Sequence, residues 1–99
     1  MIRHTVAFKL KHPSSSDAET AFLKAAKVLI SIPTVRNFEW LRQVSPKNKF
    51  TFGFSMDFAS QQDYETYNTH PDHVQFVETR WKPEVEDFLE IDYVPFAPA

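Results

Sequence analysis

The stretch Phe50-Thr51-Phe52-Gly53-Phe54-Ser55-Met56-Asp57-Phe58 decides the fold of this chain. Every second residue in it is large and apolar, and most of the residues between them are small or polar. A period of two residues predicts a β-strand with one face turned toward a core. Gly53, the only glycine of the chain, stands in the middle of this strand. A glycine at such a position indicates a bulge or the close approach of another backbone.

A similar strand opens the chain, from Ile2 to Lys11, and two further strands are expected over Val35–Val44 and Phe88–Val94. The first strand is unusual because a histidine, His4, stands in an otherwise apolar row. The residues of that row are Ile2, His4, Val6, Phe8 and Leu10.

Helix signals lie between the strands. Ser16-Asp17-Ala18-Glu19 has the pattern of a capping box, with Ser16 as N-cap and the Glu19 side chain reaching back to it. Apolar residues then recur at three- and four-residue steps as far as Pro33. A second helical region begins after Ser60. It is interrupted at Pro71, a residue that suits the first turn of a helix, and we expect it to end at Pro83.

The resulting order is β-α-β-β-α-β, which predicts an α+β, ferredoxin-like protomer with one antiparallel sheet and helices on one face. The other face of such a sheet is bare. Because several strands carry apolar residues on both faces, we expect that bare face to need a partner. Two sheets that close face to face into an α+β barrel would meet that need, so the sequence predicts a homodimer.

Length and composition agree with this prediction. The 99 residues make a single domain over 1–99, with a hydrophobic fraction of 42% and ten phenylalanines. A domain of about 100 residues buries only about two-thirds of the surface that its unfolded chain exposes. Much of the aromatic surface would therefore be covered by self-association.

The same numbers exclude several classes of function. A net charge of −2 leaves no basic stripe for a nucleic-acid partner. No apolar run is long enough for a membrane span, and the first residues carry no secretory signal. The absence of cysteine excludes disulfides, thiolate chemistry and cysteine-bound zinc. We therefore expect a cytoplasmic protein with neither nucleic acid nor membrane as a partner.

The candidate site is the run Tyr67-Asn68-Thr69-His70-Pro71-Asp72-His73, together with His4. These side chains can move protons near neutral pH, and an imidazole base beside a phenol donor suits chemistry at a carbonyl group. Tyr67, His73 and His4 are the candidate catalytic residues. His70, Phe8 and Val77 are the further candidates for contact with a ligand.

Two other interpretations of these residues remain open. In the first, the histidines brace the helix junction and His4 is a hydrogen-bonded core residue, since a polar group in an apolar row is usually a satisfied structural one. In the second, His70 and His73 bind a metal as an i, i+3 pair. A metal site needs three or four ligands, and no third ligand stands at a convincing spacing, so we expect neither metal nor cofactor.

Three segments of the chain resemble the stress-responsive dimeric α/β-barrel (Dabb) family. They are the opening strand Ile2–Lys11, the segment Tyr67–Val77 with its His-Pro-x-His element, and the ending Ile91-Asp92-Tyr93. The resemblance implies a ferredoxin-like protomer that dimerises into a barrel. The family contains plant stress proteins without established chemistry, and also olivetolic acid cyclase, which closes a linear polyketide by an aldol condensation. Similarity to that enzyme implies an acid/base pair at Tyr67 and His73, with His4 as a supporting group.

Three functional hypotheses follow. The leading one is a stress-responsive dimeric barrel protein of unknown activity, with a pocket for a small apolar or aromatic carbonyl ligand near His4, Tyr67 and His73. The alternative is a cofactor-independent acid/base enzyme, either an aldol-type cyclase or an isomerase of a small carbonyl or polyketide-like compound. The third is a purely structural oligomer, in which the aromatic interface is itself the function.

Overall fold

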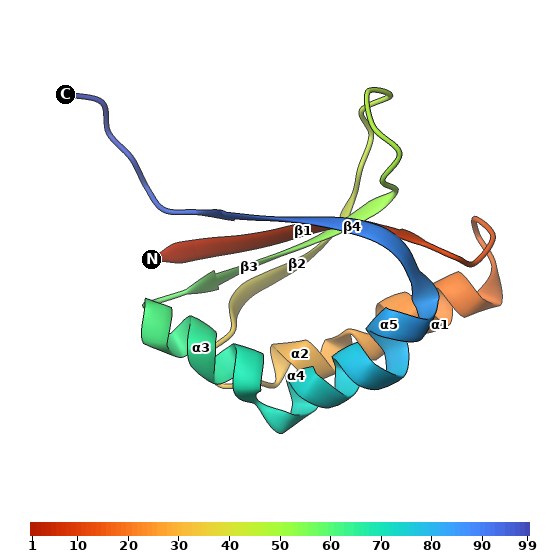
Figure 1. Ribbon diagram of the computed structural model, residues 1–99, viewed down its shortest axis with the longest axis horizontal. Helices are drawn as coiled ribbons and strands as arrows, with labels where there is room; N and C mark the ends of the chain where they lie inside the picture. Colours follow the sequence, from red (N-terminus) through yellow and green to blue (C-terminus); the bar gives the residue numbers. More distant parts are fainter.

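A four-stranded antiparallel sheet forms one layer of the molecule, in the order β2-β3-β1-β4. The computed structural model describes residues 1–99 and gives the strands as β1 (Ile2–Leu10), β2 (Arg36–Arg42), β3 (Phe52–Phe58) and β4 (Val85–Tyr93). β1 lies at the centre and pairs with both β3 and β4 (Figure 1). This order confirms the ferredoxin-like topology that the sequence predicts. β4 begins three residues earlier than expected, at Val85.

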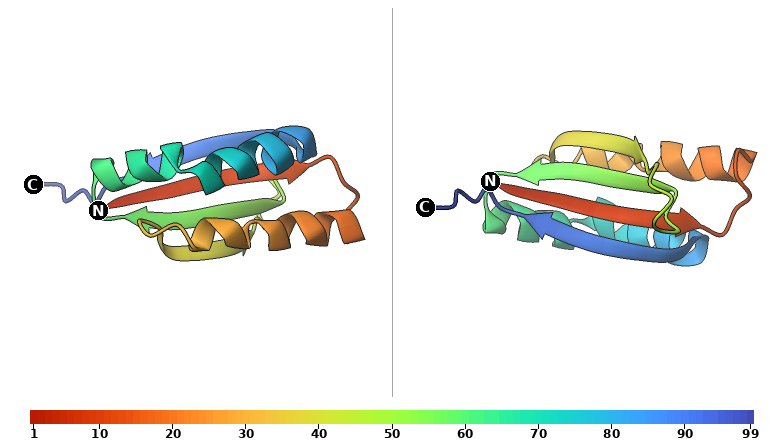
Figure 2. Two further views of the ribbon diagram at one scale, coloured as in Figure 1. Left: turned by 90° about the horizontal axis from the view of Figure 1, so that it is seen from below. Right: turned by 90° about the horizontal axis from the view of Figure 1, so that it is seen from above.

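The helices form the second layer and all cover the same face of the sheet (Figure 1). Seen from below in Figure 2, they lie in two rows along the strands, while the view from above shows the uncovered face. One row contains α1 and α2, and the other contains α3, α4, a π-helical segment η1, and α5. Their bounds are α1 Asp17–Ala25, α2 Lys27–Ile30, α3 Gln61–Thr69, α4 Pro71–Phe76, η1 Val77–Trp81 and α5 Lys82–Glu84.

The core lies between the two layers and is mostly aromatic. The alternating residues of β1 and β3 that face the helices are buried, as the period of two predicts. Phe8 is fully buried and its ring packs against the rings of Phe22, Phe54 and Trp81 at centroid distances of 5.8, 4.7 and 5.1 Å. We call this side of the sheet the covered face.

Both predicted serine caps are present. The Ser16 hydroxyl accepts the N–H of Glu19 at 3.2 Å, and the Ser60 hydroxyl accepts the N–H of Asp63 at 3.1 Å. The capping box differs from expectation in one detail. The Glu19 carboxylate accepts the N–H of Ser15 at 3.1 Å rather than that of Ser16. Ser15 has a positive φ of 63°.

The second helical region is broken at Pro71, as predicted, but it continues past Pro83. Pro83 lies within α5, and the chain leaves the helix only at Val85. The buried apolar residue of α4 is Phe76, which is 4% exposed, whereas Val74 is 46% exposed. The helix therefore ends at Glu84, one residue beyond the predicted end at Pro83.

The uncovered side of the sheet, which we call the open face, combines small residues at its centre with larger apolar ones toward its edges. Ala7 of β1 lies opposite Gly53 on one side and Leu89 on the other. Leu89 and Leu41 are 50% and 44% exposed. Two segments rise from this side of the sheet, the connection between β2 and β3 and the C-terminal residues 94–99 (Figure 1).

Gly53 has the role that its place in the strand predicts. A Cβ at this position would lie 3.2 Å from the carbonyl oxygen of Val6 on the neighbouring strand. The absence of a side chain therefore allows β1 and β3 to approach each other closely. No helix of the molecule has the length and apolar character needed to cross a membrane.

Candidate functional site

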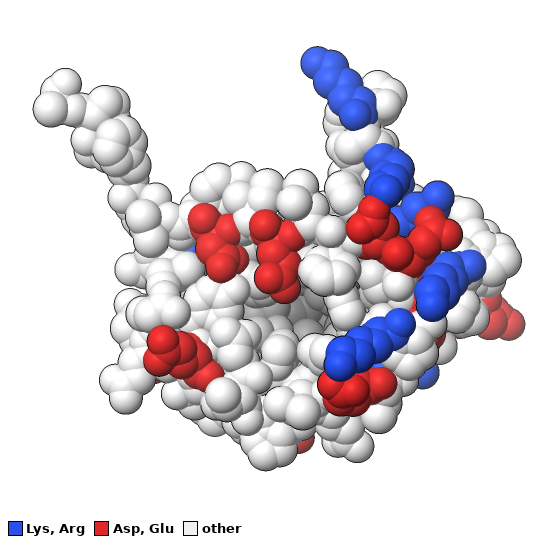
Figure 3. Space-filling view, in the orientation of Figure 1, with Lys and Arg blue, Asp and Glu red and all other residues white.

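A cavity of about 330 Å³ lies between the sheet and the row formed by α3, α4 and η1. In the space-filling view it is the hollow at the centre of the molecule, bordered by acidic and basic side chains (Figure 3). Its volume is at the lower end of the range found for small-molecule sites, about 300 to 1,000 Å³. The lining residues are His4, Val6, Leu29, Phe54, Met56, Tyr67, Asn68, His73, Phe76, Val77, Trp81, Lys82, Phe88 and Glu90.

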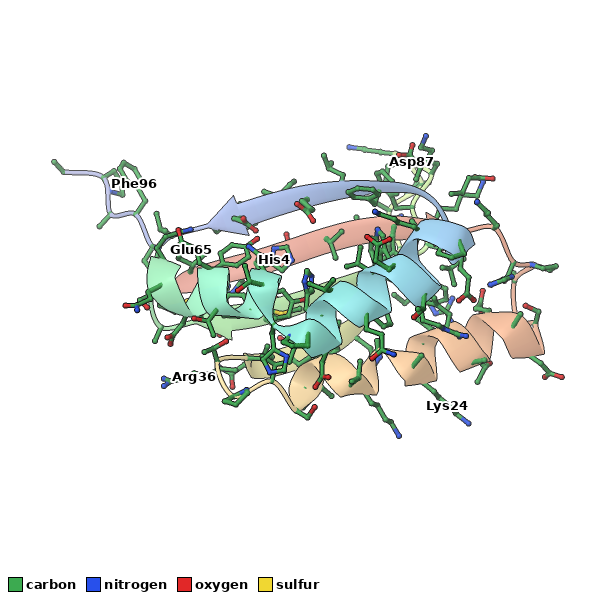
Figure 4. The ribbon with its side chains drawn as sticks, turned by 60° about the horizontal axis from the view of Figure 1, so that its bottom comes forward. His4, Lys24, Arg36, Glu65, Asp87 and Phe96 are labelled. Atoms are coloured by element: carbon green, nitrogen blue, oxygen red, sulfur yellow. The ribbon has the colours of Figure 1, made fainter.

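The structure brings His4, Tyr67 and His73 together on the wall of this cavity. The rings of Tyr67 and His73 have centroids 4.3 Å apart, and those of His4 and Tyr67 are 6.3 Å apart. His4 lies between the sheet and the helices in Figure 4. Tyr67 and His73 meet because the chain turns at Pro71, which places the last turn of α3 beside the first turn of α4.

His73 is held in one orientation by the backbone. Its Nδ1 lies 3.0 Å from the carbonyl oxygen of Asn68, which can only accept a hydrogen bond. The proton of the neutral ring is therefore on Nδ1, and Nε2 carries a lone pair. Burial lowers the pKa of His73 below its ordinary value, outweighing the opposite effect of the Asn68 hydrogen bond. His73 is consequently a neutral base at pH 7.

Tyr67 supplies a hydroxyl donor beside this base. Its side chain is nearly enclosed, with 3% of the residue exposed. Burial, and after it the negative charge of Glu90, raises the pKa of the Tyr67 phenol well above its ordinary value. The group therefore stays protonated and can donate a hydrogen bond to an oxygen in the cavity.

A third element of the site was not predicted from the sequence. His4 Nδ1 lies 2.6 Å from Asp92 Oδ1, and the Tyr64 hydroxyl lies 2.8 Å from both His4 Nδ1 and Asp92 Oδ2. Burial and, after it, the hydrogen bond to Asp92 raise the pKa of the Tyr64 phenol. Asp92 lies opposite His4 in the pairing of β4 with β1 and so faces the helices, and this register is visible only in the structure.

The three candidate ligand contacts, Val77, Phe8 and His70, do not all lie at the cavity. Val77 lines the cavity. Phe8 does not, because it is fully buried in the aromatic core. His70 does not line it either; it is the N-cap of α4, where its Nδ1 accepts the N–H of Asp72 at 3.1 Å. The structure thus differs from the sequence-based expectation for Phe8 and His70.

No three histidine, aspartate or glutamate side chains are grouped so that they could hold a metal ion. The acidic residues at the start of β4 are paired with cations instead. Glu84 contacts His12 and Arg80, Glu86 contacts Lys9, and Asp87 contacts Lys49. The polar groups that line the cavity are two imidazoles, the Tyr67 phenol and the side chains of Asn68, Lys82 and Glu90.

Comparison with known proteins places this geometry in a family. The family model described as "Stress responsive A/B Barrel Domain" matches residues 2–95. A solved structure of a Dabb-family protein with a ferredoxin-like fold from Mesorhizobium loti is 61% identical, with a TM-score of 0.95 over 97% of each chain.

Two proteins of Arabidopsis thaliana carry the same domain name. The stress-response A/B barrel domain-containing protein At5g22580 is 34% identical over 75% of this chain and 68% of its own length. A second, longer stress-response A/B barrel domain-containing protein is 27% identical over 95% of this chain, which spans only 36% of the length of that relative. A dimeric protein of unknown function from Bacteroides fragilis is 22% identical over 93% of each chain, with a TM-score of 0.71, and shows the fold alone. The chain belongs to the stress responsive A/B barrel domain family.

Proposed function

We propose that the protein binds a small, largely apolar molecule with a carbonyl oxygen in the cavity between the sheet and α3–η1. One observation carries this proposal: His4, Tyr67 and His73 converge at a mostly apolar cavity of about 330 Å³. A mostly apolar pocket with a few convergent polar groups is the usual form of a small-molecule site. The apolar wall would hold the ligand body, and the Tyr67 hydroxyl would donate to its oxygen.

Binding can be tested with a matched pair of probes, 4-methylacetophenone and 4-ethyltoluene, which have similar shapes but differ in the carbonyl oxygen. We expect the ketone to raise the melting temperature in a saturable way, by an amount that grows with its concentration. Tyr67→Phe should remove most of the preference for the ketone. Tyr93→Phe is the control, because Tyr93 is 54% exposed and lies on the open face. An equal or absent response to both probes contradicts the proposal.

A second candidate function, acid/base catalysis, is favoured by the Tyr67–His73 pair. Nε2 of His73 would take a proton from the carbon next to the carbonyl, and the electron pair of that C–H bond would form the enolate. The Tyr67 hydroxyl would donate to the enolate oxygen. The enolate carbon could then attack a second carbonyl, whose oxygen takes the proton back from His73 Nε2, as in an aldol-type cyclisation. In an isomerisation the same proton would return to a different carbon. No cofactor is needed for either step.

Proton abstraction can be measured without the natural substrate. In deuterated water we expect the protein to exchange the methyl protons next to the carbonyl of 4-methylacetophenone, followed by NMR. His73→Gln should abolish this exchange, while His12→Gln should leave it unchanged, because His12 lies outside the cavity and pairs with Glu84. Exchange at the uncatalysed rate in the unmodified protein would contradict the enzymatic function, and the binding function would remain as the sole candidate.

The protein is further proposed to act as a homodimer in which two open faces meet. Large apolar side chains remain exposed on this face, with Leu89 50% and Ile91 41% exposed. Small residues at its centre, Ala7 and Gly53, would let two sheets approach. The segments that rise from this side would flank the partner (Figure 1). The dimeric protein from Bacteroides fragilis, which shares the fold, supports this assembly.

Light scattering during size-exclusion chromatography tests the assembly. We expect the mass of a dimer, and a monomer after Ile91→Lys, because two like charges would then face each other in the interface. Val74→Lys is the control, since Val74 is exposed on α4 in the helical layer. A wild-type monomer, or a dimer that survives Ile91→Lys, contradicts the proposal. A mass above that of a dimer would favour a purely structural oligomer.

We also infer a cytoplasmic location and no nucleic-acid partner. Small secreted domains are commonly stabilised by disulfides, and this chain has no cysteine. The net charge of −2 provides no basic surface for a phosphate backbone. A fluorescent fusion and a gel-shift assay with duplex DNA test the two inferences separately.

A further inference from the structure

We propose that Asp92 and Tyr64 fix the tautomer of His4, so that His4 presents the lone pair of Nε2 to the cavity as a second proton acceptor beside His73. Asp92 and Tyr64 are then positioning residues, and His4 is the group that touches the ligand. This inference rests on the proposed binding function and extends it to a class of ligand. The cavity would favour molecules that have a hydroxyl group as a hydrogen-bond donor.

The hydrogen-bond chemistry of the three side chains determines where the His4 proton lies. An ionised carboxylate can only accept, so the 2.6 Å contact between His4 Nδ1 and Asp92 Oδ1 requires a proton on Nδ1. The single hydrogen of the Tyr64 hydroxyl is donated to Asp92 Oδ2 at 2.8 Å. The Tyr64 oxygen is then free to accept from the same Nδ1–H at 2.8 Å. In the neutral ring, Nε2 is left without a proton.

Nε2 of His4 is open to the cavity. His4 is 5% exposed and its ring lines the cavity wall, yet all its side-chain hydrogen bonds are made by Nδ1. Two enclosed side-chain atoms have no hydrogen-bond partner, Thr34 Oγ1 and Arg80 Nε, and Nε2 of His4 is not one of these enclosed atoms. The free nitrogen therefore has access to the space that a ligand would fill.

His73 also has its proton held on Nδ1, but by a different kind of hydrogen-bond acceptor than His4. A backbone carbonyl holds Nδ1–H of His73, and a carboxylate holds Nδ1–H of His4. Both rings contact Tyr67, at centroid distances of 4.3 and 6.3 Å. The cavity thus offers two acceptor nitrogens and one donor hydroxyl. A ligand with a carbonyl oxygen and a hydroxyl group would satisfy Tyr67 and His4 together.

A purely structural role for the network is the competing explanation, since Tyr64 also ties α3 to the sheet. That role predicts hydrogen bonds among the three side chains but no dependence of ligand selectivity on Asp92. The test therefore needs two measurements, one of the His4 tautomer and one of selectivity. Neither measurement requires the natural ligand.

The tautomer can be read from long-range ¹H–¹⁵N correlation spectra of the uniformly labelled protein at about pH 8, where imidazoles are largely neutral. We expect His4 to show the pattern of a ring protonated on Nδ1 alone. Asp92→Asn should raise the fraction protonated on Nε2, because an amide can donate to Nδ1. Asp57→Asn is the matched control, since Asp57 is a carboxylate on the open face beside Arg3.

Selectivity can be measured with 4-methylphenol and 4-methylanisole, which differ in a hydroxyl donor. We expect Asp92→Asn to lower the preference for the phenol about three- to tenfold, the equivalent of one hydrogen bond. Asp57→Asn should leave the preference unchanged. A wild-type His4 protonated on Nε2, as the other tautomer or as an imidazolium, overturns the inference even if the variant does not fold. An unchanged preference in folded Asp92→Asn also overturns it.

Failure of the inference and failure of the proposed function have different signatures. Suppose that 4-methylphenol, 4-methylanisole and 4-methylacetophenone all fail to bind while His4 is protonated on Nδ1 alone. The binding function is then contradicted and the tautomer assignment stands. If the ketone binds and His4 is protonated on Nε2, the binding function stands and the inference about His4 is overturned.

Discussion

The two faces of the sheet are built from the same strands but contain different kinds of residue. On the covered face, β1 contributes His4 and Phe8, which are 5% and 0% exposed, and the space above them is filled with rings or enclosed as a cavity. On the open face, β1 contributes Ala7 and Lys9, flanked by exposed Leu89. Alternate residues of β1 thus point to two faces, one packed against the helices and one left uncovered. The covered face encloses the cavity that His4 lines, and the open face leaves apolar side chains such as Leu89 exposed.

This difference explains where the titratable groups with burial-shifted pKa values lie. Tyr64, Tyr67 and His73 are all on the covered side, and burial is the main cause of each shift. Each pKa moves in the direction that favours the neutral form, so the phenols remain donors and the imidazole remains an acceptor near pH 7. Burial on the covered face therefore favours the neutral forms of these three side chains.

The largest expected effect comes from truncating the centre of the covered face. Phe8→Ala removes a fully buried ring that packs against Phe22, Phe54 and Trp81. We expect a loss of about 3 to 5 kcal/mol in the free energy of unfolding, measured with urea. Lys9→Ala, the next residue along the strand, should change that free energy by less than about 0.5 kcal/mol, because it lies on the open face. Equal losses would show that the two faces do not differ as described.

The sequence predicts much of this two-faced architecture. The alternation in Phe50–Phe58 and Ile2–Lys11 identifies the strands and their buried rows, and the serines at 16 and 60 identify the helix starts. The grouping of His4, Tyr67 and His73 also agrees with the cavity that the structure contains. These features depend on local periodicity, capping and a known family pattern, which a single chain displays directly.

The remaining features depend on contacts between distant segments. Asp92 is 88 residues from His4, and their pairing is set by the register of β4 on β1. Tyr64 reaches both groups only because α3 packs over that end of the sheet. Phe8 and His70 have residue types suited to a pocket. However, the packing of the core places Phe8 among other rings, and the start of α4 uses His70 as a cap.

A smaller loss of stability is expected from a substitution at Gly53, where β1 and β3 lie close together on the open face. Gly53→Ala adds a Cβ 3.2 Å from the carbonyl oxygen of Val6, on a strand that is paired on both sides and cannot move freely. We expect a loss of about 1 to 3 kcal/mol in the free energy of unfolding, as for other overpacked sites. Ser55→Ala, two residues further along the same face, removes a hydroxyl and adds no atom toward β1, so it should cost less than Gly53→Ala. A neutral Gly53→Ala would show that β1 and β3 can separate without penalty.

The smallest expected effect is the pH dependence that burial gives to His73. Because its pKa in the folded protein is below the ordinary value of about 6.5, the unfolded chain binds this proton more readily. The contribution of His73 to stability is therefore complete above about pH 6.5 and decreases as the pH falls from there toward the pKa of the folded state. His73→Gln should reduce the slope of melting temperature against pH in this window. An NMR titration of the ring gives an independent check, since a midpoint at or above about 6.5 would mean that the covered face does not desolvate His73.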